Sequence, residues 1–387
     1  MNLFDNYIER RGTGSVKYDF PEFFGKSKDL LPLWIADMDF KAPEPVIEAL
    51  IERSRHGIFG YTDSTEEYFS ALYSWFEKYH GWKIKHEWLV KMPGVVFAFS
   101  AAIRALTNIG DSVIIQQPTY KPFAESIRLN ERKLVVNQLV YENKKYSVDF
   151  ADFEQKIKEN NVKLFILCSP HNPVGRVWKK EELKKMGDIC LKYDVKILSD
   201  EVHQDFVYPG HKHVVFADIG SEFANNSIIC TNPSKSFNLA GLQNSNIFIP
   251  NESIREKIVH EMEKTGYGEP NIMGMVACQA AYSNGRPWFD ALMLYLADNL
   301  SLVKETASRI EGLDVVEPEG TYVAWLDFGD MKLSSDEIDD LVTKKAGLWL
   351  DPGRKFGQGG EQFQRLNIAC PRSTLQEALG KLEKACR

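Results

Sequence analysis

Short apolar runs alternate with segments of helical periodicity between about residue 110 and residue 250. The runs end in polar or Gly/Pro-rich loops, as the buried strands of a parallel sheet do. They cover residues 113–115, 164–167, 195–198, 228–230 and 247–249. From Glu181 to Tyr193, apolar residues recur every three or four positions, which is typical of a helix with one buried face. This alternation predicts an α/β domain with a mainly parallel central sheet.

The pattern changes near Trp288. A helical pattern without glycine or proline begins there, and strand-like segments such as 322–326 follow it. With 387 residues, the chain is long enough to bury two cores. We therefore predict three parts: an N-terminal arm that also contributes to the small domain (1–45), a large domain (46–287) and a small α+β domain (288–387).

Two helix starts in the last part carry a capping signal. Ser334 is followed by Glu337, and Ser373 by Gln376, three residues later in each case. In a capping box, these two side chains satisfy the free N–H groups of the first helical turn. We expect one helix to begin after Ser334 and the final helix after Ser373.

Composition narrows the function classes. Apolar residues make up 44% of the chain and the net charge is −7, so a nucleic-acid protein is disfavoured because phosphate binding needs a concentrated positive face. No segment approaches the roughly 20 apolar residues that span a bilayer, and no export signal is apparent. We predict a cytoplasmic protein that binds neither membrane nor nucleic acid.

The cysteines and histidines give no metal signal. The six cysteines are scattered without a Cys-x-x-Cys pair, so we expect reduced core residues and no structural metal site. The short stretch His211-Lys212-His213 is expected to lie in a solvated loop.

Polar side chains follow three of the predicted strands. Asn172 lies in the loop after 164–167, Asp200 and His203 follow 195–198, and Lys235 lies just beyond 228–230. In an open α/β sheet, ligands bind beyond the carboxyl ends of the strands. An amide, an acid and an amine are therefore expected to converge there.

These residues belong to a series of motifs that spans nearly the whole chain. The series is Pro93-Gly94-Val95-Val96, Pro118-Thr119-Tyr120, Asn172-Pro173-x-Gly175, Asp200-Glu201, Ser234-Lys235 and Arg365-Leu366-Asn367. It resembles the fold-type I pyridoxal 5'-phosphate (PLP) enzymes of the class I/II aminotransferase family. The resemblance implies the type I PLP-dependent transferase fold, PLP as cofactor and an amino acid as substrate.

Four further segments resemble the MalY/PatB branch of cystathionine β-lyases within that family. They are Trp34 to Phe40, Gly60 to Thr62, Pro233 to Leu242 and Trp349 to Gly353. This resemblance favours cleavage of a carbon–sulfur bond.

The resemblance implies a role for each polar residue near the cofactor ring. A lysine is usually a solvated surface residue, but here Lys235 would carry PLP as an imine and then act as the base that takes the α-proton. Asp200 would keep the pyridine nitrogen protonated, and His203 would hold Asp200 in place. Asn172 would donate to the phenolic oxygen, and Tyr120 would stack on the ring.

The phosphate needs N–H donors and a positive dipole end. Gly94, Val95 and Val96 open a helical stretch, and a helix N-terminus supplies both. Ser234 would add a hydroxyl. By resemblance, Tyr61 would reach the phosphate of a neighbouring subunit, which predicts a homodimer.

One position departs from the family pattern. Many family members carry an arginine eight residues after the lysine, and this chain has Gln243 there. The phosphate would depend more on backbone donors and on the residues named above.

The substrate carboxylate is expected at Arg365, since arginine makes a bidentate contact that lysine cannot. The backbone at Ala36 would also contact this carboxylate. Neither residue distinguishes between the possible reactions.

We predict a PLP-dependent carbon–sulfur β-lyase that cleaves L-cystathionine or a related cysteine S-conjugate to a thiol (homocysteine), pyruvate and ammonia. The nearest alternative is a PLP-dependent aminotransferase acting on an amino acid and a 2-oxo acid. A further alternative is a family member with an added role in binding a transcriptional regulator.

Overall fold

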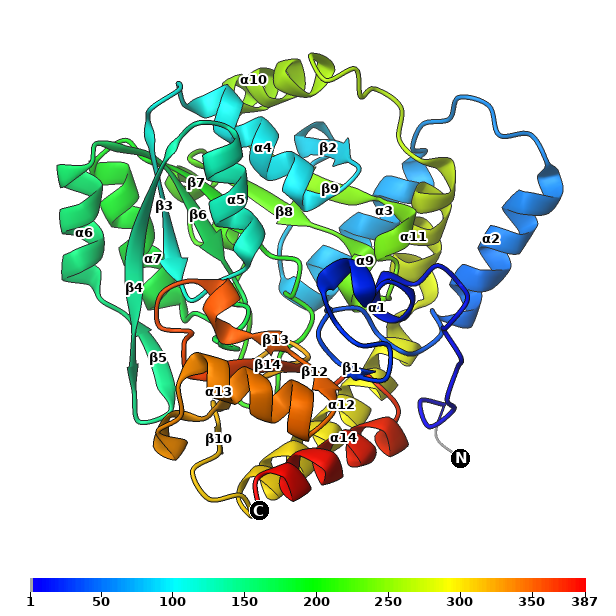
Figure 1. Ribbon diagram of the computed structural model, residues 1–387. Helices are drawn as coiled ribbons and strands as arrows, with labels where there is room; N and C mark the ends of the chain where they lie inside the picture. Colours follow the sequence, from blue (N-terminus) through cyan, green and yellow to red (C-terminus); the bar gives the residue numbers. More distant parts are fainter. Residues whose placement is uncertain (1–2) are drawn as a thin grey trace.

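The computed structural model describes residues 3–387, which fold around an eight-stranded sheet with the order β2-β9-β8-β7-β6-β3-β4-β5 (Figure 1). Its strands are β2 (Leu89–Met92), β3 (Ser112–Gln117), β4 (Lys133–Glu142), β5 (Lys145–Val148), β6 (Val162–Cys168), β7 (Lys196–Asp200), β8 (Ser227–Thr231) and β9 (Ser245–Phe248). Each of the five predicted runs overlaps one of them.

The centre of this sheet is parallel, as predicted. Strands β4, β3, β6, β7 and β8 run in one direction, while β9 is antiparallel to both β8 and β2, and β5 is antiparallel to β4. Along β6, Leu164 and Ile166 pack into the core on one face, and Phe165 and Leu167 pack into the core on the other. The two-residue period of a strand therefore supplies both cores, which is why the run reads as continuously apolar.

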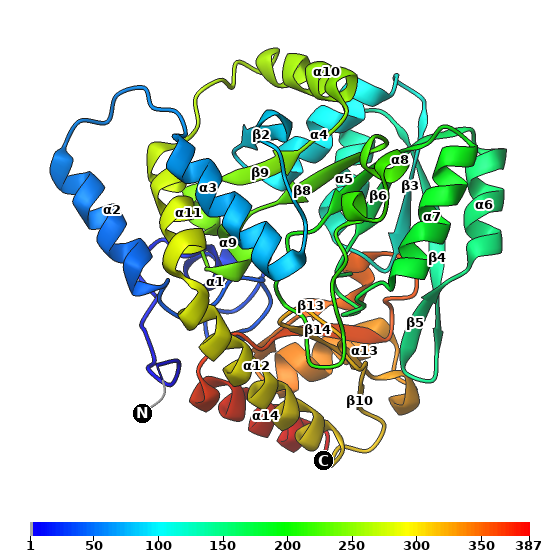
Figure 2. The ribbon, with the colours of Figure 1, turned by 180° about the vertical axis from the view of Figure 1, so that it is seen from behind.

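Helices cover both faces of the sheet (Figures 1 and 2). On one face lie α4 (Val95–Leu106), α5 (Lys121–Leu129) and α10 (Glu252–Glu263). The other helices of this part are α2 (Glu44–His56), α3 (Glu66–Trp75), α6 (Phe150–Glu159), α7 (Lys180–Lys192), α8 (Ser221–Ala224), α9 (Pro233–Ser236) and α11 (Ile272–Asn284). Between residues 3 and 387, no helix has both the length and the apolar character needed to cross a bilayer.

A second, antiparallel sheet has the order β10-β11-β14-β13. Its strands are β10 (Asp314–Val315), β11 (Val323–Asp327), β13 (Asp351–Pro352) and β14 (Phe363–Asn367). The helices of this region are α12 (Arg286–Ala307), α13 (Ser335–Asp340) and α14 (Arg372–Ala385). The N-terminal arm joins it because β1 (Leu31–Pro32) pairs with β12 (Leu348–Trp349); the arm also holds α1 (Val16–Asp19).

The helix starts confirm one capping prediction and correct the other. Ser334 caps α13, and both hydrogen bonds of the box with Glu337 are present. Helix α14 instead begins at Arg372, with Pro371 at the N-cap position, so Ser373 lies inside the first turn. The prediction for Ser373 is wrong because the preceding proline, whose φ is fixed near the helical value, starts the helix earlier.

The N-terminal arm is fixed by buried charges. Asp39 is 5% exposed and accepts hydrogen bonds from Lys17 Nζ at 2.7 Å, Arg10 Nη1 at 2.7 Å and Tyr18 Oη at 3.1 Å. Arg10 also pairs with Asp37 at 2.6 Å. The Lys17 side chain is itself buried, so its ammonium depends on these carboxylates.

Replacing Asp39 by Asn removes the carboxylate closest to the buried Lys17 ammonium. We expect Asp39→Asn to lower the free energy of unfolding by about 3 kcal/mol, because breaking a buried pair leaves a charge uncompensated. Urea denaturation of the purified protein measures this change. The control is Asp340→Asn, which breaks an exposed pair with Lys344 and should cost less than about 1 kcal/mol. Equal losses in the two variants would contradict this account of the arm.

Candidate active site

A cavity of about 510 Å³ opens beyond the carboxyl ends of β6, β7 and β8, beside β14. Most of the predicted site residues line it. They are Ala36, Val95, Tyr120, Asn172, Asp200, His203, Lys235 and Arg365. The parallel strands, the second sheet and the N-terminal arm together bring residues that lie up to 329 positions apart, from 36 to 365, to one cavity.

Asp200 is the last residue of β7, and its side chain is buried. Its carboxylate accepts one recorded hydrogen bond, from Val202 N at 3.3 Å. Burial raises the pKa of this carboxyl to about 7, against the lowering effects of that hydrogen bond and of nearby Lys235. A carboxylate in this setting lacks a cationic hydrogen-bond partner and faces a cavity that can hold one.

His203 lines the same cavity. Within residues 3–387, however, it makes no hydrogen bond to Asp200. Its ring instead contacts the rings of Tyr322, at 5.6 Å between centroids, and Phe206, at 6.1 Å. Burial lowers the pKa of the imidazole well below its usual value, with Lys235 and Arg365 adding to the effect. His203 is therefore a neutral, packed ring in this structure.

Lys235 lies in the short helix α9, directly after β8. The Asn232 side chain caps this turn by accepting from Ser234 N at 3.2 Å. The Lys235 amine donates to the carbonyl of Ala36 at 2.6 Å. Burial and the nearby Arg365 lower the pKa of the amine to about 8, although the carboxylates of Asp37 and Asp200 oppose this. The amine is thus far closer to its neutral, nucleophilic form than an ordinary lysine.

The loop after β6 holds Asn172. Its glycine, Gly175, has φ of 73°, and a Cβ there would lie 2.8 Å from Pro318. The Gly175 carbonyl accepts from Glu319 N at 2.8 Å. A residue without a side chain is therefore required where this loop meets the segment that precedes β11.

Arg365 lies on β14 and is held from three sides. Its Nη2 donates to Asp351 Oδ2 at 2.9 Å and to the carbonyl of Trp34 at 2.8 Å, and its Nη1 donates to Asn172 Oδ1 at 3.1 Å. Its Nε is buried and has no hydrogen-bond partner among residues 3–387. The guanidinium is therefore fixed at the cavity before any ligand arrives.

Sequence reasoning assigned no role to Asp351 or to the aromatic wall of this cavity. Asp351 lies opposite Arg365 in the pairing of β13 with β14. Trp34 and Trp349 stack with centroids 4.5 Å apart and planes at 8°. All three residues lie inside the segments that resemble the MalY/PatB branch. The sequence therefore pointed to these segments, but it did not indicate which contacts their side chains make.

The N-terminus of α4 supplies the expected anion-binding end. Gly94 is its N-cap and Val95 lines the cavity, whereas Val96 is 39% exposed. Ser234 and the exposed Gln243 are not among the residues that line this cavity. Tyr120 does line it, and burial raises the pKa of its phenol to about 12, so the ring stays neutral.

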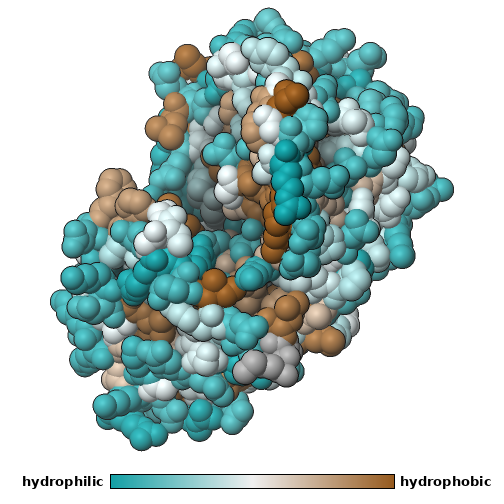
Figure 3. All heavy atoms as spheres, turned by 90° about the vertical axis from the view of Figure 1, so that its right-hand side faces the viewer, coloured by the Kyte–Doolittle hydropathy of each residue, from teal (hydrophilic) through white to brown (hydrophobic). Residues whose placement is uncertain are grey.

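Tyr61 lies apart from the other predicted residues. It is 94% exposed, in the stretch between α2 and α3, and it does not line the cavity of its own chain. Ile58 and Phe59 beside it are also exposed, at 67% and 59%. Figure 3 shows apolar side chains interrupting the polar surface on the side of the molecule that faces right in Figure 1.

No group of three or more His, Cys, Asp and Glu side chains within residues 3–387 is arranged to hold a metal ion. His213 is buried, contrary to the expectation of a solvated loop, because its ring pairs with the buried Glu201 at 2.8 Å. His211 and Lys212 are exposed as expected.

The donor set of the cavity fits PLP. An amine of lowered pKa suits an aldehyde, a lone buried carboxylate suits a pyridine N–H, and a helix N-terminus suits a phosphate. Each of these observations concerns a different end of the cofactor. The roles of the individual residues stay predictions.

Comparison with known proteins also points to a PLP-dependent enzyme, and the matches extend over nearly the whole chain. The family model "Aminotransferase class I and II" matches residues 28–382. The chain is 43% identical to "Cystathionine beta-lyase PatB" of Bacillus subtilis over 384 residues, 99% of both chains. It is 32% identical to "Protein MalY" of Escherichia coli over 388 residues, 99% of this chain and 98% of that protein.

Among solved structures, cystalysin from Treponema denticola, which contains a pyridoxal 5'-phosphate cofactor, superposes with a TM-score of 0.95 at 38% identity. The match covers 100% of this chain and 98% of that one. The predicted fold and the resemblance to MalY and PatB are therefore confirmed. The chain belongs to the aminotransferase class I and II family.

Proposed function

We propose that this protein is a PLP-dependent carbon–sulfur β-lyase that converts L-cystathionine or a related cysteine S-conjugate into a thiol (homocysteine), pyruvate and ammonia. The observation that carries the proposal is the single cavity that holds Lys235, Asp200 and Arg365, in a chain 43% identical to PatB over 99% of both proteins. Relatives named for the same reaction, and not the catalytic residues alone, favour a lyase.

Bound PLP supplies an electron sink for the negative charge left when the α-proton of the substrate departs. Lys235 would hold the cofactor through its amine and would take that proton, for which a pKa of about 8 suits it. Asp200 would keep the ring nitrogen protonated, and the positive nitrogen would compensate the burial of the Asp200 carboxylate. Asn172, Tyr120 and His203 line the space around the ring.

The substrate carboxylate binds Arg365. Asp351, the Trp34 carbonyl and Asn172 orient the guanidinium, so little side-chain freedom is lost on binding. Ala36, whose carbonyl accepts a hydrogen bond from the Lys235 amine, lines the same cavity as Arg365. The α-carbon is thereby held next to the amine that removes its proton.

Gly94, Val95 and Val96 would hold the cofactor phosphate, and the hydroxyl of Ser234, the residue before Lys235, would add a donor. The Tyr61 ring is 94% exposed and does not line the cavity of its own chain. It is therefore free to complete the phosphate site of a second copy of the chain. We therefore propose a homodimer. The division into parts at residues 45 and 287 and a cytoplasmic location also remain proposals.

An aminotransferase is the main alternative, since it would use the same lysine, aspartate and arginine. A role in binding a transcriptional regulator is the other, and the complete cavity does not exclude it. The two enzymatic readings differ in whether turnover needs a 2-oxo acid.

Purified enzyme with PLP should release pyruvate and free thiol from L-cystathionine without any added 2-oxo acid. Coupled pyruvate and thiol assays, run with and without 2-oxoglutarate, measure this directly. Lys235→Ala is the control and should abolish release. Amino-group transfer seen only with 2-oxoglutarate would replace the lyase with an aminotransferase. A regulator-binding role should survive Lys235→Ala.

Arg365→Lys keeps the charge but loses the planar pair of donors. We expect kcat/KM for cystathionine to fall about 10- to 100-fold, mainly through KM, because a bidentate contact to the substrate carboxylate is lost. Steady-state kinetics provide the measurement. Arg354→Lys alters an exposed arginine that pairs with Asp336 and Asp339, so its kinetics should match the wild type.

The pH dependence of cofactor loading should report the Lys235 amine. Only the neutral amine attacks an aldehyde, and the folded protein lowers its pKa from 10.5 to about 8. The rate at which apoenzyme recombines with PLP should therefore rise about tenfold per unit as pH increases towards 8 and then level off. Stopped-flow absorbance of the cofactor follows this reaction. A rate that keeps rising to about pH 10 would show an ordinary lysine.

A further inference from the structure

The rim of the active-site cavity carries side chains that the proposed reaction does not use. They come from the N-terminal arm, from α5 and from the segment after β13, and each is at least partly exposed. They are Phe24, Lys26, Lys121, Glu125 and Lys355. Because these side chains line the cavity that holds Lys235 and also reach solvent, they border the path along which a substrate enters.

Lys26 is a rim cation without a carboxylate partner. Within residues 3–387, its ammonium makes no hydrogen bond and no ion pair. Burial lowers the pKa of this amine against the raising effect of Asp339, and Lys355 and Arg354 lower it further. The side chain is only half-buried, so a ligand in the cavity can reach it. A partly desolvated ammonium next to other cations is stabilised by an anion that binds beside it.

The other two rim lysines already have carboxylate partners. Lys121 pairs with Glu125 at 2.6 Å, and Lys355 pairs with Asp351 at 3.0 Å. An anion that binds either of these lysines has to compete with the carboxylate already there. At Lys26, a ligand anion gains a cation without such competition.

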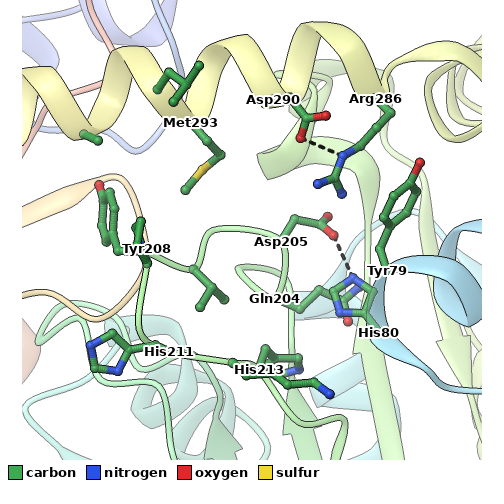
Figure 4. A pocket seen from close by; sticks show the side chains of 15 residues that line it. Tyr79, His80, Gln204, Asp205, Tyr208, His211, His213, Arg286, Asp290 and Met293 are labelled. Carbon is green, nitrogen blue, oxygen red and sulfur yellow. Dashed lines mark hydrogen bonds and ion pairs between the residues drawn. The ribbon is translucent and has the colours of Figure 1, made fainter.

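A separate cavity of about 530 Å³, between α12 and residues 204–213, shows the contrast (Figure 4). Its arginine, Arg286, pairs with Asp290 at 2.7 Å. Its buried carboxylate, Asp205, pairs with His80 at 2.8 Å. Both charged groups are therefore matched inside the chain, whereas the Lys26 ammonium has no such partner among the described residues.

An aromatic wall, made of Phe24, Trp34 and Trp349, connects Arg365 with Lys26. The Phe24 ring lies 5.0 Å from the Trp34 ring and 5.7 Å from the Trp349 ring, between centroids, and the two indoles stack on each other. At one end the Trp34 carbonyl accepts from Arg365 Nη2, and at the other Lys26 follows Phe24 by two residues. A substrate whose α-carboxylate binds Arg365 can therefore extend along this wall towards Lys26.

Lys26 and Lys235 lie in different parts of the same cavity. The charged groups that act on the Lys235 amine are Arg365, Asp37 and Asp200. None of them is among the groups that act on Lys26, which belong to the segment 339–355. Since charge interactions weaken with distance, the two amines occupy different ends of the cavity. Lys26 is thus placed for the far end of a substrate and not for its α-carboxylate.

We propose that Lys26 is a specificity-determining residue that binds an anionic group at the far end of the leaving thiol. The preferred substrates are then cysteine S-conjugates whose leaving group carries a carboxylate, with the atoms between the two ends packed on the aromatic wall. The homocysteine part of L-cystathionine carries such a carboxylate. This inference rests on the proposed lyase for the identity of the leaving group, but recognition of the tail is independent of which bond breaks.

Three cysteine S-conjugates of equal length test the charge at the far end. S-(3-carboxypropyl)-L-cysteine is cystathionine without its distal amino group, S-(3-carbamoylpropyl)-L-cysteine is the neutral amide, and S-(4-aminobutyl)-L-cysteine carries a positive charge. With the holoenzyme, kcat/KM for the acid should exceed that for the amide about tenfold, as for a charge-assisted contact, and the amine should be the poorest substrate. Release of pyruvate and thiol measures these values.

Equilibrium binding separates this inference from the reaction. L-2-Aminosuberate has the same number of atoms between its carboxylates as cystathionine but no leaving group, and L-2-aminooctanoate is its counterpart with an uncharged end. Calorimetric titration into the holoenzyme should show that aminosuberate binds about tenfold more tightly. If no conjugate releases pyruvate but this difference persists, the lyase proposal fails and the role of Lys26 stands.

Variants at Lys26 assign the preference to its charge. Lys26→Met should abolish the preference for the acid over the amide, and Lys26→Glu should make the amine a better substrate than the acid, which loss of folding cannot imitate. Lys28→Met is the matched control and should keep the wild-type ratio, because Lys28 is exposed and does not line the cavity. Equal kcat/KM for acid and amide in the wild type, or an acid preference that survives Lys26→Met, would overturn the proposal.

Discussion

Asp200 ends a central parallel strand with its carboxylate buried, and the arrangement of the active site depends on how that charge is compensated. In a parallel sheet, the ends of β6, β7 and β8 meet at one edge, so a carboxylate there faces whatever the neighbouring loops present. In the part of the chain that the structure describes, no cation lies within hydrogen-bonding distance of this carboxylate, and burial raises its pKa to about 7. A bound pyridinium nitrogen would resolve this cost. Burial, together with the nearby Arg365, lowers the pKa of the Lys235 amine.

The positions of Asn172, Asp200 and Lys235 were predictable because each follows an apolar run, and the period of a strand and the geometry of a parallel sheet are local rules. The hydrogen bonds that orient the Arg365 side chain were not predictable. They involve Asp351 on an adjacent strand and a carbonyl more than 300 residues earlier, and such antiparallel pairing and arm docking leave no local pattern. The expected hydrogen bond between His203 and Asp200 is not formed within the described residues. Sequence spacing does not determine the orientation of the imidazole, which packs against Tyr322 instead.

Side chains of the segment after β7 point to its two sides. His203 lines the active-site cavity, whereas Asp205, on the other side of the segment, binds His80, Trp75 and Ser236. Ser236 is the neighbour of Lys235, so the buried carboxylate of Asp205 anchors the turn that carries the lysine. The burial of His213, which its sequence context did not predict, belongs to the same layer of paired acids and imidazoles.

All six cysteines are unpaired, and five of them are buried. Cys168 even lines the active-site cavity, where burial and the Asp200 charge raise the pKa of its thiol far above the usual value. Only a thiolate attacks a disulfide or reacts readily with oxidants. An enzyme that liberates thiols thus keeps the sulfur that lines its cavity protonated. A disulfide formed from the released thiol therefore meets no thiolate there that could attack it by exchange.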